Sequence, residues 1–305
     1  MSRAFRLISA RKCLMIIQLY VNKTAVDISP DAGASILKFS HDGQDMMRST
    51  NDRDNSSKSA LQTACFPLVP YSNRIRDGRF TFEGEEIDLS SANAAFKHAL
   101  HGTGWLNSWR VKMRSETVCQ CDYRPTTNVW PWAYRAEQLF ELSDQKLCVK
   151  LSITNESDRN MPCGLGLHPY FPNVSKASLQ FDMDGVWIGD EDVLPRNWAA
   201  APPNWDFNTQ RTLLGADIDN CFTGFNSQAQ IQWKDKRFGL KIKTDKSVQF
   251  AVVYVPPNED YFCFEPVTHM NDAANWSKSL EGTGWQSLAP GETFTTNYIF
   301  QVTEP

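Results

Sequence analysis

The stretch Arg135-Ala-Glu-Gln-Leu-Phe-Glu-Leu142, Ser143-Asp-Gln145, Lys146-Leu-Cys-Val-Lys-Leu-Ser-Ile-Thr154 decides the fold class. Apolar and polar residues alternate on both sides of a short polar turn. Because successive side chains of an extended strand point to opposite faces, this period of two is typical of strands with one buried face. The stretch therefore predicts an antiparallel hairpin, with strands at Arg135–Leu142 and Lys146–Thr154.

The same period recurs along almost the whole chain, whereas helix signals are few and short. The other predicted strands are Met15–Tyr20, Ala25–Ser29, Gly33–Ser40, Arg79–Phe82, Glu86–Leu89, Trp109–Met113, Thr117–Tyr123, Ser178–Met183, Gln228–Trp233, Phe238–Thr244, Val248–Val255, Tyr261–Glu265 and Phe294–Val302. The best helix candidate, Asp272–Leu280, has a poor amphipathic pattern. So many strands separated by short turns predict an all-β protein, a large antiparallel β-sandwich with few short helices.

Composition limits the domain organisation and the function classes. The chain has 305 residues, and 41% of them are hydrophobic, which is enough for a sizeable core. No linker divides it, so we expect a single domain over residues 15–305, preceded by a flexible basic extension at residues 1–14 that lacks the apolar core of a signal peptide. The interspersed charges, with a net charge of −4, favour neither nucleic acid nor membrane as a partner. We expect a cytoplasmic protein.

The eight cysteines do not have the spacing of a disulfide framework. Cys119 and Cys121 share one face of a predicted strand, and Cys148 and Cys263 lie among apolar strand residues. Buried free thiols in a reducing compartment explain this pattern better. Because the chain has no CxxC pair, a zinc site built on cysteines is not expected.

Tyr261-Phe-Cys-Phe-Glu-Pro266 places a carboxylate directly after four β-favouring residues. A buried carboxylate is costly unless it is paired, hydrogen-bonded or used in chemistry. We expect Pro266 to stop the strand, so that Glu265 lies at a strand terminus. Glu265 is the predicted catalytic base, and a buried salt bridge is the alternative.

Phe66-Pro-Leu-Val-Pro-Tyr-Ser-Asn-Arg-Ile75 contains a candidate substrate-binding arginine, Arg74, next to Asn73. The two prolines fix an extended path, on which a rigid guanidinium fork can bind hydroxyl oxygens. Taken alone, the segment is better explained as a surface loop with an ordinary salt-bridged arginine.

His98-Ala-Leu-His101-Gly102, followed by Thr103-Gly-Trp105, is a second candidate segment. A glycine next to a histidine permits close approach of a ligand to the backbone, and Trp105 offers a stacking face. Two histidines three residues apart, with neither a helical pattern nor a carboxylate nearby, are weak support for a metal site.

Leu165-Gly-Leu-His168-Pro-Tyr-Phe171 supplies a candidate acid. Histidine exchanges protons near neutral pH, although a lone histidine in such a place is more often structural. The chain contains no nucleophile elbow, P-loop or dinucleotide fingerprint. This inventory favours proton transfer over covalent or cofactor chemistry.

Five short motifs together make the chain similar to a known family. They are Pro67-Leu-Val-Pro-Tyr-Ser-Asn-Arg-Ile75, Leu100-His-Gly102, His168-Pro-Tyr-Phe171, Asp219-Asn-Cys-Phe222 and Phe264-Glu-Pro266. In this order they resemble the aldose 1-epimerase (galactose mutarotase) family, whose fold is a large antiparallel β-sandwich. The resemblance spans most of the chain and agrees with the strand pattern.

The resemblance implies a role for each matched residue. Glu265 would be the general base that takes the proton of the anomeric hydroxyl, and His168 would be the general acid that protonates the ring oxygen. His101 would hydrogen-bond the sugar near these two oxygens, while Arg74 and Asp219 would fix the other hydroxyls.

The implied activity is interconversion of the α and β anomers of a free aldose, an isomerase reaction with a monosaccharide substrate and without cofactor or metal. Asn73 and Trp105 join the predicted substrate-binding residues, and His98 does so with hydrogen-bonding and structural use both open. The chain departs from the family pattern at Thr103-Gly104 and Pro172-Asn173, which leaves the preferred sugar open. A hexose-6-phosphate 1-epimerase and a non-catalytic carbohydrate-binding module are the alternatives, and both a monomer and a homodimer fit.

Overall fold

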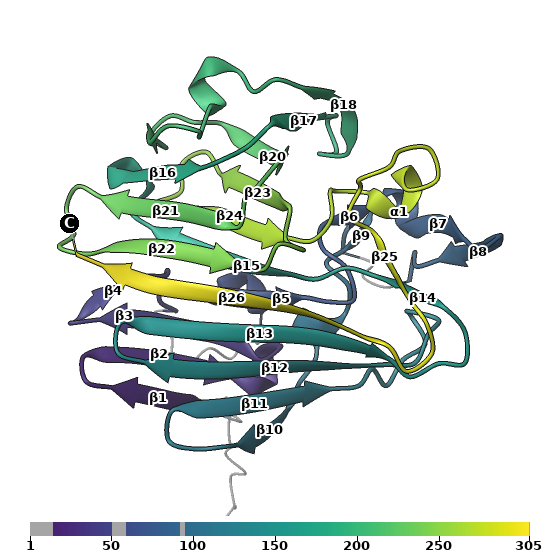
Figure 1. Ribbon diagram of the computed structural model, residues 1–305, viewed down its shortest axis with the longest axis horizontal. Coiled ribbons are helices and arrows are strands. Elements are labelled where there is room, and N and C mark those ends of the chain that lie inside the picture. Colours follow the sequence, from purple (N-terminus) through teal and green to yellow (C-terminus); the bar gives the residue numbers. More distant parts are fainter. Residues whose placement is uncertain (1–14, 51–58, 92–94, 305) are drawn as a thin grey trace, which may run out of the picture.

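A computed structural model describes residues 15–50, 59–91 and 95–304. Within these residues the chain forms two large antiparallel sheets, packed face to face as layers (Figure 1). The predicted extension at 1–14 lies outside the described residues. The β-sandwich expected from the sequence is confirmed.

The first sheet is the layer that carries the candidate site. In the described residues its strands follow the order β1-β2-β3-β5-β15-β24-β23-β20-β17-β18, with β4 paired to β3. Their bounds are β1 (Ile17–Val21), β2 (Thr24–Ser29), β3 (Ser35–His41), β4 (Gln44–Asp45), β5 (Cys65–Leu68), β15 (Gly166–Pro172), β24 (Tyr261–Val267), β23 (Phe250–Val255), β20 (Ile218–Thr223), β17 (Gly185–Gly189) and β18 (Pro195–Ala199).

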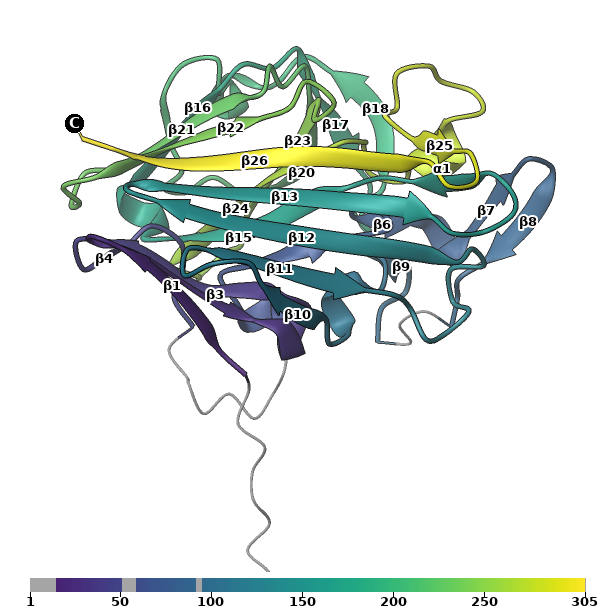
Figure 2. The same cartoon turned by 60° about the horizontal axis from the view of Figure 1, so that its bottom comes forward.

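The second sheet covers the inner face of the first (Figure 2). Its order is β10 (Arg110–Met113), β11 (Val118–Tyr123), β12 (Tyr134–Ser143), β13 (Lys146–Asn155), β26 (Thr293–Thr303), β22 (Gly239–Thr244), β21 (Gln228–Trp233), β16 (Ala177–Phe181) and β19 (Arg211–Thr212). The β12–β13 hairpin confirms the prediction, with Ser143 paired to Lys146, so only Asp144 and Gln145 form the turn.

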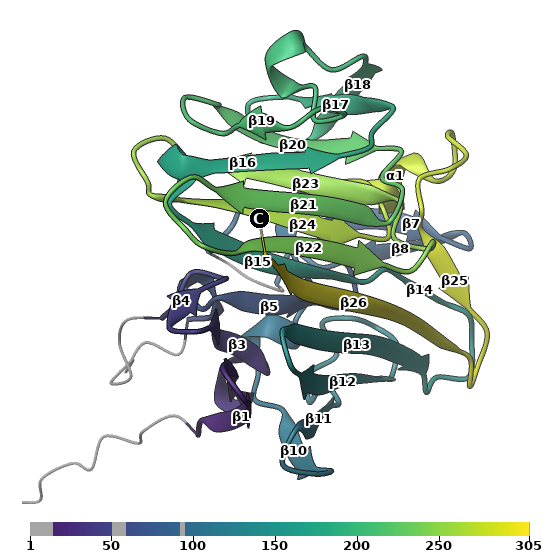
Figure 3. The same ribbon diagram turned by 60° about the vertical axis from the view of Figure 1, so that its left-hand side comes forward.

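Short elements gather at one end of the sandwich, where α1, β7 and β8 lie together (Figures 1 and 3). The paired strands there and nearby are β6 (Arg74–Ile75) with β9 (Ala99–Leu100), β7 (Arg79–Phe82) with β8 (Glu85–Asp88), and β14 (Met161–Cys163) with β25 (Gln286–Leu288). The 3₁₀ turns are Pro30–Ala32, Ala60–Gln62, Arg76–Gly78, Gly104–Leu106, Val174–Lys176 and Pro203–Trp205.

The helix predicted at Asp272–Leu280 is reduced to one turn, α1 (Ala273–Trp276). Within this turn Ala273 and Ala274 are buried, so the apolar face is too short to support a longer helix. All the predicted strands are present, with bounds that differ by at most two residues at either end.

Hydrophobic side chains cover the first sheet on both faces. Phe171, Phe264 and others pack between the two sheets in the main core. Phe66, Tyr170 and Val252 belong to a second cluster on the opposite face of the first sheet. Strands buried on both faces can lack polar alternation, which explains why β5 and β15 were not predicted. β20 was missed because two adjacent polar residues, Asp219 and Asn220, interrupt its alternation.

Every cysteine in the described part of the chain is a free thiol, and all but the half-buried Cys148 are buried, as predicted. Among the same residues, no helix has the length and apolar character needed to cross a membrane.

The interlayer core should dominate stability. Phe171 is fully buried between the sheets against Phe262. Its replacement by alanine should lower the free energy of unfolding of the protein by roughly 3–5 kcal/mol. The control Tyr20→Ala, at a side chain 63% exposed, should change it by about 0.5 kcal/mol or less. Urea unfolding measures both, and similar losses in the two variants would contradict this assignment of the core.

Candidate active site

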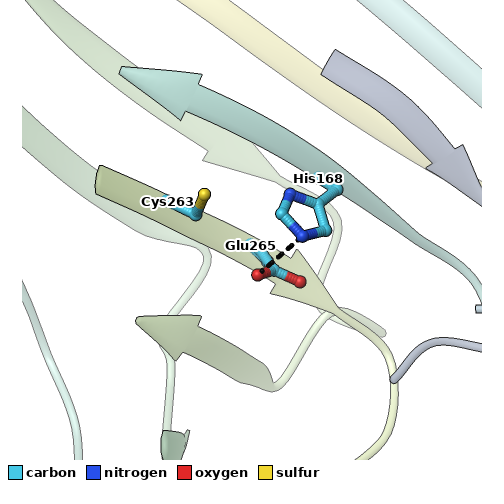
Figure 4. A group of neighbouring side chains, drawn as sticks. All are labelled: His168, Cys263 and Glu265. Carbon is cyan, nitrogen blue, oxygen red and sulfur yellow. Dashed lines mark ion pairs between the residues drawn. The ribbon is translucent and has the colours of Figure 1, made fainter. Parts of the chain in front are cut away.

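The two predicted proton-transfer residues are neighbours on adjacent strands. Gly166 of β15 lies opposite Val267 of β24, and Tyr170 lies opposite Cys263, so this register puts His168 opposite Glu265. Both side chains point from the same face, and Nε2 of His168 lies 3.3 Å from Oε1 of Glu265 (Figure 4). The pair is therefore fixed by strand register, in the middle of a sheet.

The expectation that Pro266 ends the strand is wrong. β24 continues to Val267, with Pro266 paired to Ala251 and Val267 paired to Phe250 of β23. In an antiparallel sheet each residue directs its hydrogen-bonding groups to one neighbour only. A proline thus removes one donor on one side, and the strand persists. Glu265 consequently lies within the strand, opposite Val252 of β23 as well as His168.

Burial dominates the electrostatics of the pair, because only 7% of His168 and 2% of Glu265 are exposed. Burial raises the pKa of Glu265 well above its usual value; Asp219 raises it further and Arg74 opposes the shift. Burial likewise lowers the pKa of His168 to about 3. Both shifts favour the neutral form of each group.

Aromatic rings enclose the histidine. The ring of His168 lies against Phe66, with centroids 4.5 Å apart, and against Tyr170 at 4.7 Å. The guanidinium of Arg48 covers the Tyr170 ring at 3.8 Å. Within the described part of the chain, Nδ1 of His168 and Oε2 of Glu265 are buried and have no hydrogen-bond partner. Buried polar atoms without a hydrogen-bond partner, in two residues with strongly shifted pKa values, are characteristic of a ligand site.

His101 is held as a neutral hydrogen-bond donor. Its Nδ1 accepts a hydrogen bond from the backbone N–H of Asn73 at 3.0 Å, so the proton of the neutral ring is on Nε2. The backbone N–H of His101 in turn donates to the Asn73 carbonyl at 2.9 Å. Burial lowers the pKa of His101 well below 6.5, and His168 and Arg74 lower it further. The ring meets His168 edge to face, with centroids 5.3 Å apart.

The backbone near His101 is tightly packed. His101 has a φ of 58°, and Gly102, with a φ of 65°, has no room for a side chain. A Cβ on Gly102 would lie 2.4 Å from the Val69 carbonyl oxygen and 2.5 Å from Cδ of Pro70. Contact with the Val69-Pro70 segment therefore requires this glycine, a reason different from the ligand approach that the sequence suggested.

Arg74 and Asp219 lie beside the pair, on β6 and β20. The charge of Arg74 counteracts the raised pKa of both Asp219 and Glu265, so the guanidinium lies close enough to act on both carboxyl groups. Burial nevertheless raises the pKa of Asp219. The backbone N–H of Arg74 donates to Oδ1 of Asn73 at 2.9 Å. Among the predicted site residues, these two join Glu265 and His168 in one electrostatic cluster.

Trp105 and His98 lie farther from the pair. Trp105 is only 3% exposed, stacks on Phe66 with centroids 5.3 Å apart and donates its indole N–H to the Gly102 carbonyl, so it supports the site from beneath. His98 accepts from the Asp77 backbone N–H at 3.0 Å and lines a separate cavity of about 240 Å³ with Arg74. Of the two uses left open for His98, this geometry favours the structural one.

His269 was not singled out by the sequence, yet it holds the Asn73-Arg74 segment in place. Its Nε2 accepts from the Ser72 backbone N–H at 3.0 Å, and its Nδ1 donates to the Met270 carbonyl at 2.8 Å. Since 197 residues separate Ser72 from His269, no local pattern signals this contact.

A cavity of about 710 Å³ lies on the same face of the first sheet. Trp187, Trp198, Phe250 and Met270 contribute to its lining. It extends from Phe250 of β23, the strand next to Glu265, to Trp187 of β17, three strands from Glu265.

Comparison with known proteins shows the family of this chain. Residues 16–301 match the family model of aldose 1-epimerase. The chain belongs to the aldose 1-epimerase family. An uncharacterised member of similar sequence, YphB of Escherichia coli K12, is 31% identical over 285 residues, which cover 91% of this chain and 95% of that protein.

Solved structures extend the comparison. An E. coli K12 protein whose assignment as an aldose 1-epimerase is provisional has a crystal structure with a TM-score of 0.88 and 30% identity, covering 96% of this chain and 100% of its own. Galactose 1-epimerase of Lactobacillus acidophilus NCFM has a TM-score of 0.78 with 20% identity over 95% of each chain. At this lower identity the likeness concerns the fold.

Gly102 should be far less replaceable than another glycine of similar backbone conformation. At Gly43, with a φ of 77°, a new Cβ would have no atom within 4 Å, so Gly43→Ala costs only the strain of the left-handed backbone, about 1–2 kcal/mol. Gly102→Ala has the same strain and a steric clash in addition. Urea unfolding should give a clearly larger loss for Gly102→Ala. Equal losses would contradict the contact with Val69-Pro70.

His269 should make stability depend on pH. Burial lowers its folded-state pKa to about 4, against 6.5 in the unfolded chain, so between these values the unfolded state binds more protons. Unfolding free energy should therefore fall as the pH falls from 6.5 towards 4, by up to about 1.4 kcal/mol per pH unit from this residue. The His269→Gln variant should lack this contribution. A pH-independent difference between wild type and variant, measured by urea unfolding, would contradict the shift.

Proposed function

We propose that this protein is a mutarotase, an aldose 1-epimerase that interconverts the α and β anomers of a free aldose. The observation that carries the proposal is the buried Glu265–His168 pair, in which Nε2 of His168 lies 3.3 Å from Oε1 of Glu265. Ring opening of a cyclic sugar needs one base and one acid, and the pair supplies both with no net exchange with solvent.

The proposed reaction starts with Glu265 ionised and His168 protonated. This state differs from the neutral pair only by a proton transfer between two facing atoms. Glu265 takes the proton of the C1 hydroxyl while the bond between C1 and the ring oxygen breaks. The bonding electrons pass to the ring oxygen, which takes the proton of His168, and C1 becomes an aldehyde. Rotation about the C1–C2 bond and reclosure, with both proton transfers reversed, gives the other anomer.

The surrounding residues would orient the sugar. His101 presents an Nε2–H donor that is suited to the ring oxygen or the C1 hydroxyl. Arg74 can donate to, and Asp219 can accept from, the remaining hydroxyls. Together they would hold the reacting atoms near the proton pair, which is the positioning that such catalysis requires.

The neighbouring arginines favour a free aldose over a 6-phosphate. A phosphate site needs uncommitted cationic groups. Arg76 lies 3.5 Å from Asp190 and 3.7 Å from Asp272, and Arg79 lies 3.1 Å from Asp88. A non-catalytic sugar-binding module would not need both His168 and Glu265. The free buried thiols fit a reducing compartment, so we place the activity in the cytoplasm.

The activity is tested by polarimetry on freshly dissolved α-D-glucose and α-D-galactose. The protein should speed anomer equilibration, and Glu265→Gln should slow the catalysed rate by about 10²–10⁴-fold because the base is lost. Glu86→Gln, at an exposed glutamate of β8, is the matched control and should retain the wild-type rate. Failure to accelerate any aldose in a wider sugar panel would refute the proposal, and full activity of Glu265→Gln would remove Glu265 from the mechanism.

A further inference from the structure

We propose that His168, Cys263 and Glu265 also form a binding site for a thiophilic divalent cation, with Zn²⁺ as the natural candidate. The site would occupy the same space as the reacting atoms of the sugar. A bound cation would block the proton pair, so inhibition by the cation rests on the proposed function. Binding of the cation does not depend on that function.

Strand geometry brings the three ligand atoms together. Cys263 and Glu265 are two residues apart on β24 and therefore project from the same face, and His168 faces them from β15 (Figure 4). One ligand atom from each residue lies within 4.8 Å of the others. Tetrahedral Zn²⁺ with ordinary bond lengths needs separations of roughly 3.3–3.8 Å between its ligand atoms. The separation of 3.3 Å between Nε2 of His168 and Oε1 of Glu265 lies in this range, and the remaining separations, which are at most 4.8 Å, would shorten when the cation binds.

Two buried polar atoms of the cluster provide a second observation. In the described part of the chain, Nδ1 of His168 and Oε2 of Glu265 are buried polar atoms without a hydrogen-bond partner. Their residues are only 7% and 2% exposed. A cation bound at either atom would remove the cost of leaving a buried polar group unpaired.

The donor set selects the class of cation. Nitrogen, sulfur and oxygen donors from histidine, cysteine and glutamate are the usual ligands of zinc, and the thiolate disfavours Mg²⁺ and Ca²⁺. With the thiol and the carboxyl ionised, the two negative charges balance the dication in a buried site. Three protein ligands leave a fourth position for water, as in zinc sites with an open coordination position.

Sequence spacing does not reveal this site. The absence of a CxxC pair argued against zinc, but that argument concerns ligands close together in the chain. Here the sheet pairs β15 with β24, so a histidine meets a cysteine and a glutamate from a distant segment.

Cobalt(II) titration of the full-length protein tests the proposal directly, since a Co²⁺–thiolate bond gives a charge-transfer absorption in the near ultraviolet. Wild type should develop this band at one equivalent. Cys263→Ser should lack it and should bind Zn²⁺ at least about tenfold more weakly by calorimetry, a loss of about 1.4 kcal/mol. Cys221→Ser, at another buried cysteine on the same face of the sheet, is the matched control and should behave as wild type.

Absence of the band in wild type, or equal Zn²⁺ affinity in wild type and Cys263→Ser, would overturn the proposal and leave only adventitious surface binding. Neither readout needs turnover, so a failed sugar assay would not affect them. If the protein equilibrates an aldose, Zn²⁺ should inhibit wild type and Cys221→Ser more strongly than Cys263→Ser. Equal inhibition of all three proteins would show that Zn²⁺ inhibits by binding somewhere other than this site.

Discussion

The cross-strand contact between His168 and Glu265 is the constraint on which the account of this protein depends. The register of β15 against β24 places the two side chains opposite each other on a sheet that is covered on both faces. Burial would make either charged group costly, and the shifted pKa values favour the neutral form of each. The fold thus holds an acid and a base side by side without the desolvation cost of a buried ion pair.

The groups around this pair are positioned by backbone contacts. His101 and Asn73 exchange hydrogen bonds through ring and backbone, and His269 holds Ser72 from the opposite side. Rigid support of this kind fixes the tautomer and orientation of each ring before a ligand arrives, which is the condition for efficient proton transfer. A small loop rearrangement near Gly102 would displace His101 while leaving the proton pair in its sheet.

Sequence patterns predicted the half-exposed parts of this fold and missed parts of the rest for a physical reason. Strands with one polar face, such as β12 and β13, are predicted by their alternation, whereas β5 and β15 are buried almost throughout and lack it. Chemical reasoning singled out Glu265 and His168, and the matched motifs added Asp219. The support from Phe66 and His269 arises from contacts between distant segments, for which a single sequence carries no signal.

The neutral state of the pair is tested most directly by the protonation state of His168. Imidazole ¹⁵N NMR of the ligand-free protein at pH 5, assigned with a His168→Gln variant, distinguishes a neutral ring from an imidazolium. The account predicts a neutral His168 ring at this pH, because its pKa lies near 3. An imidazolium that loses its proton near the ordinary histidine pKa, about 6.5, would contradict the account.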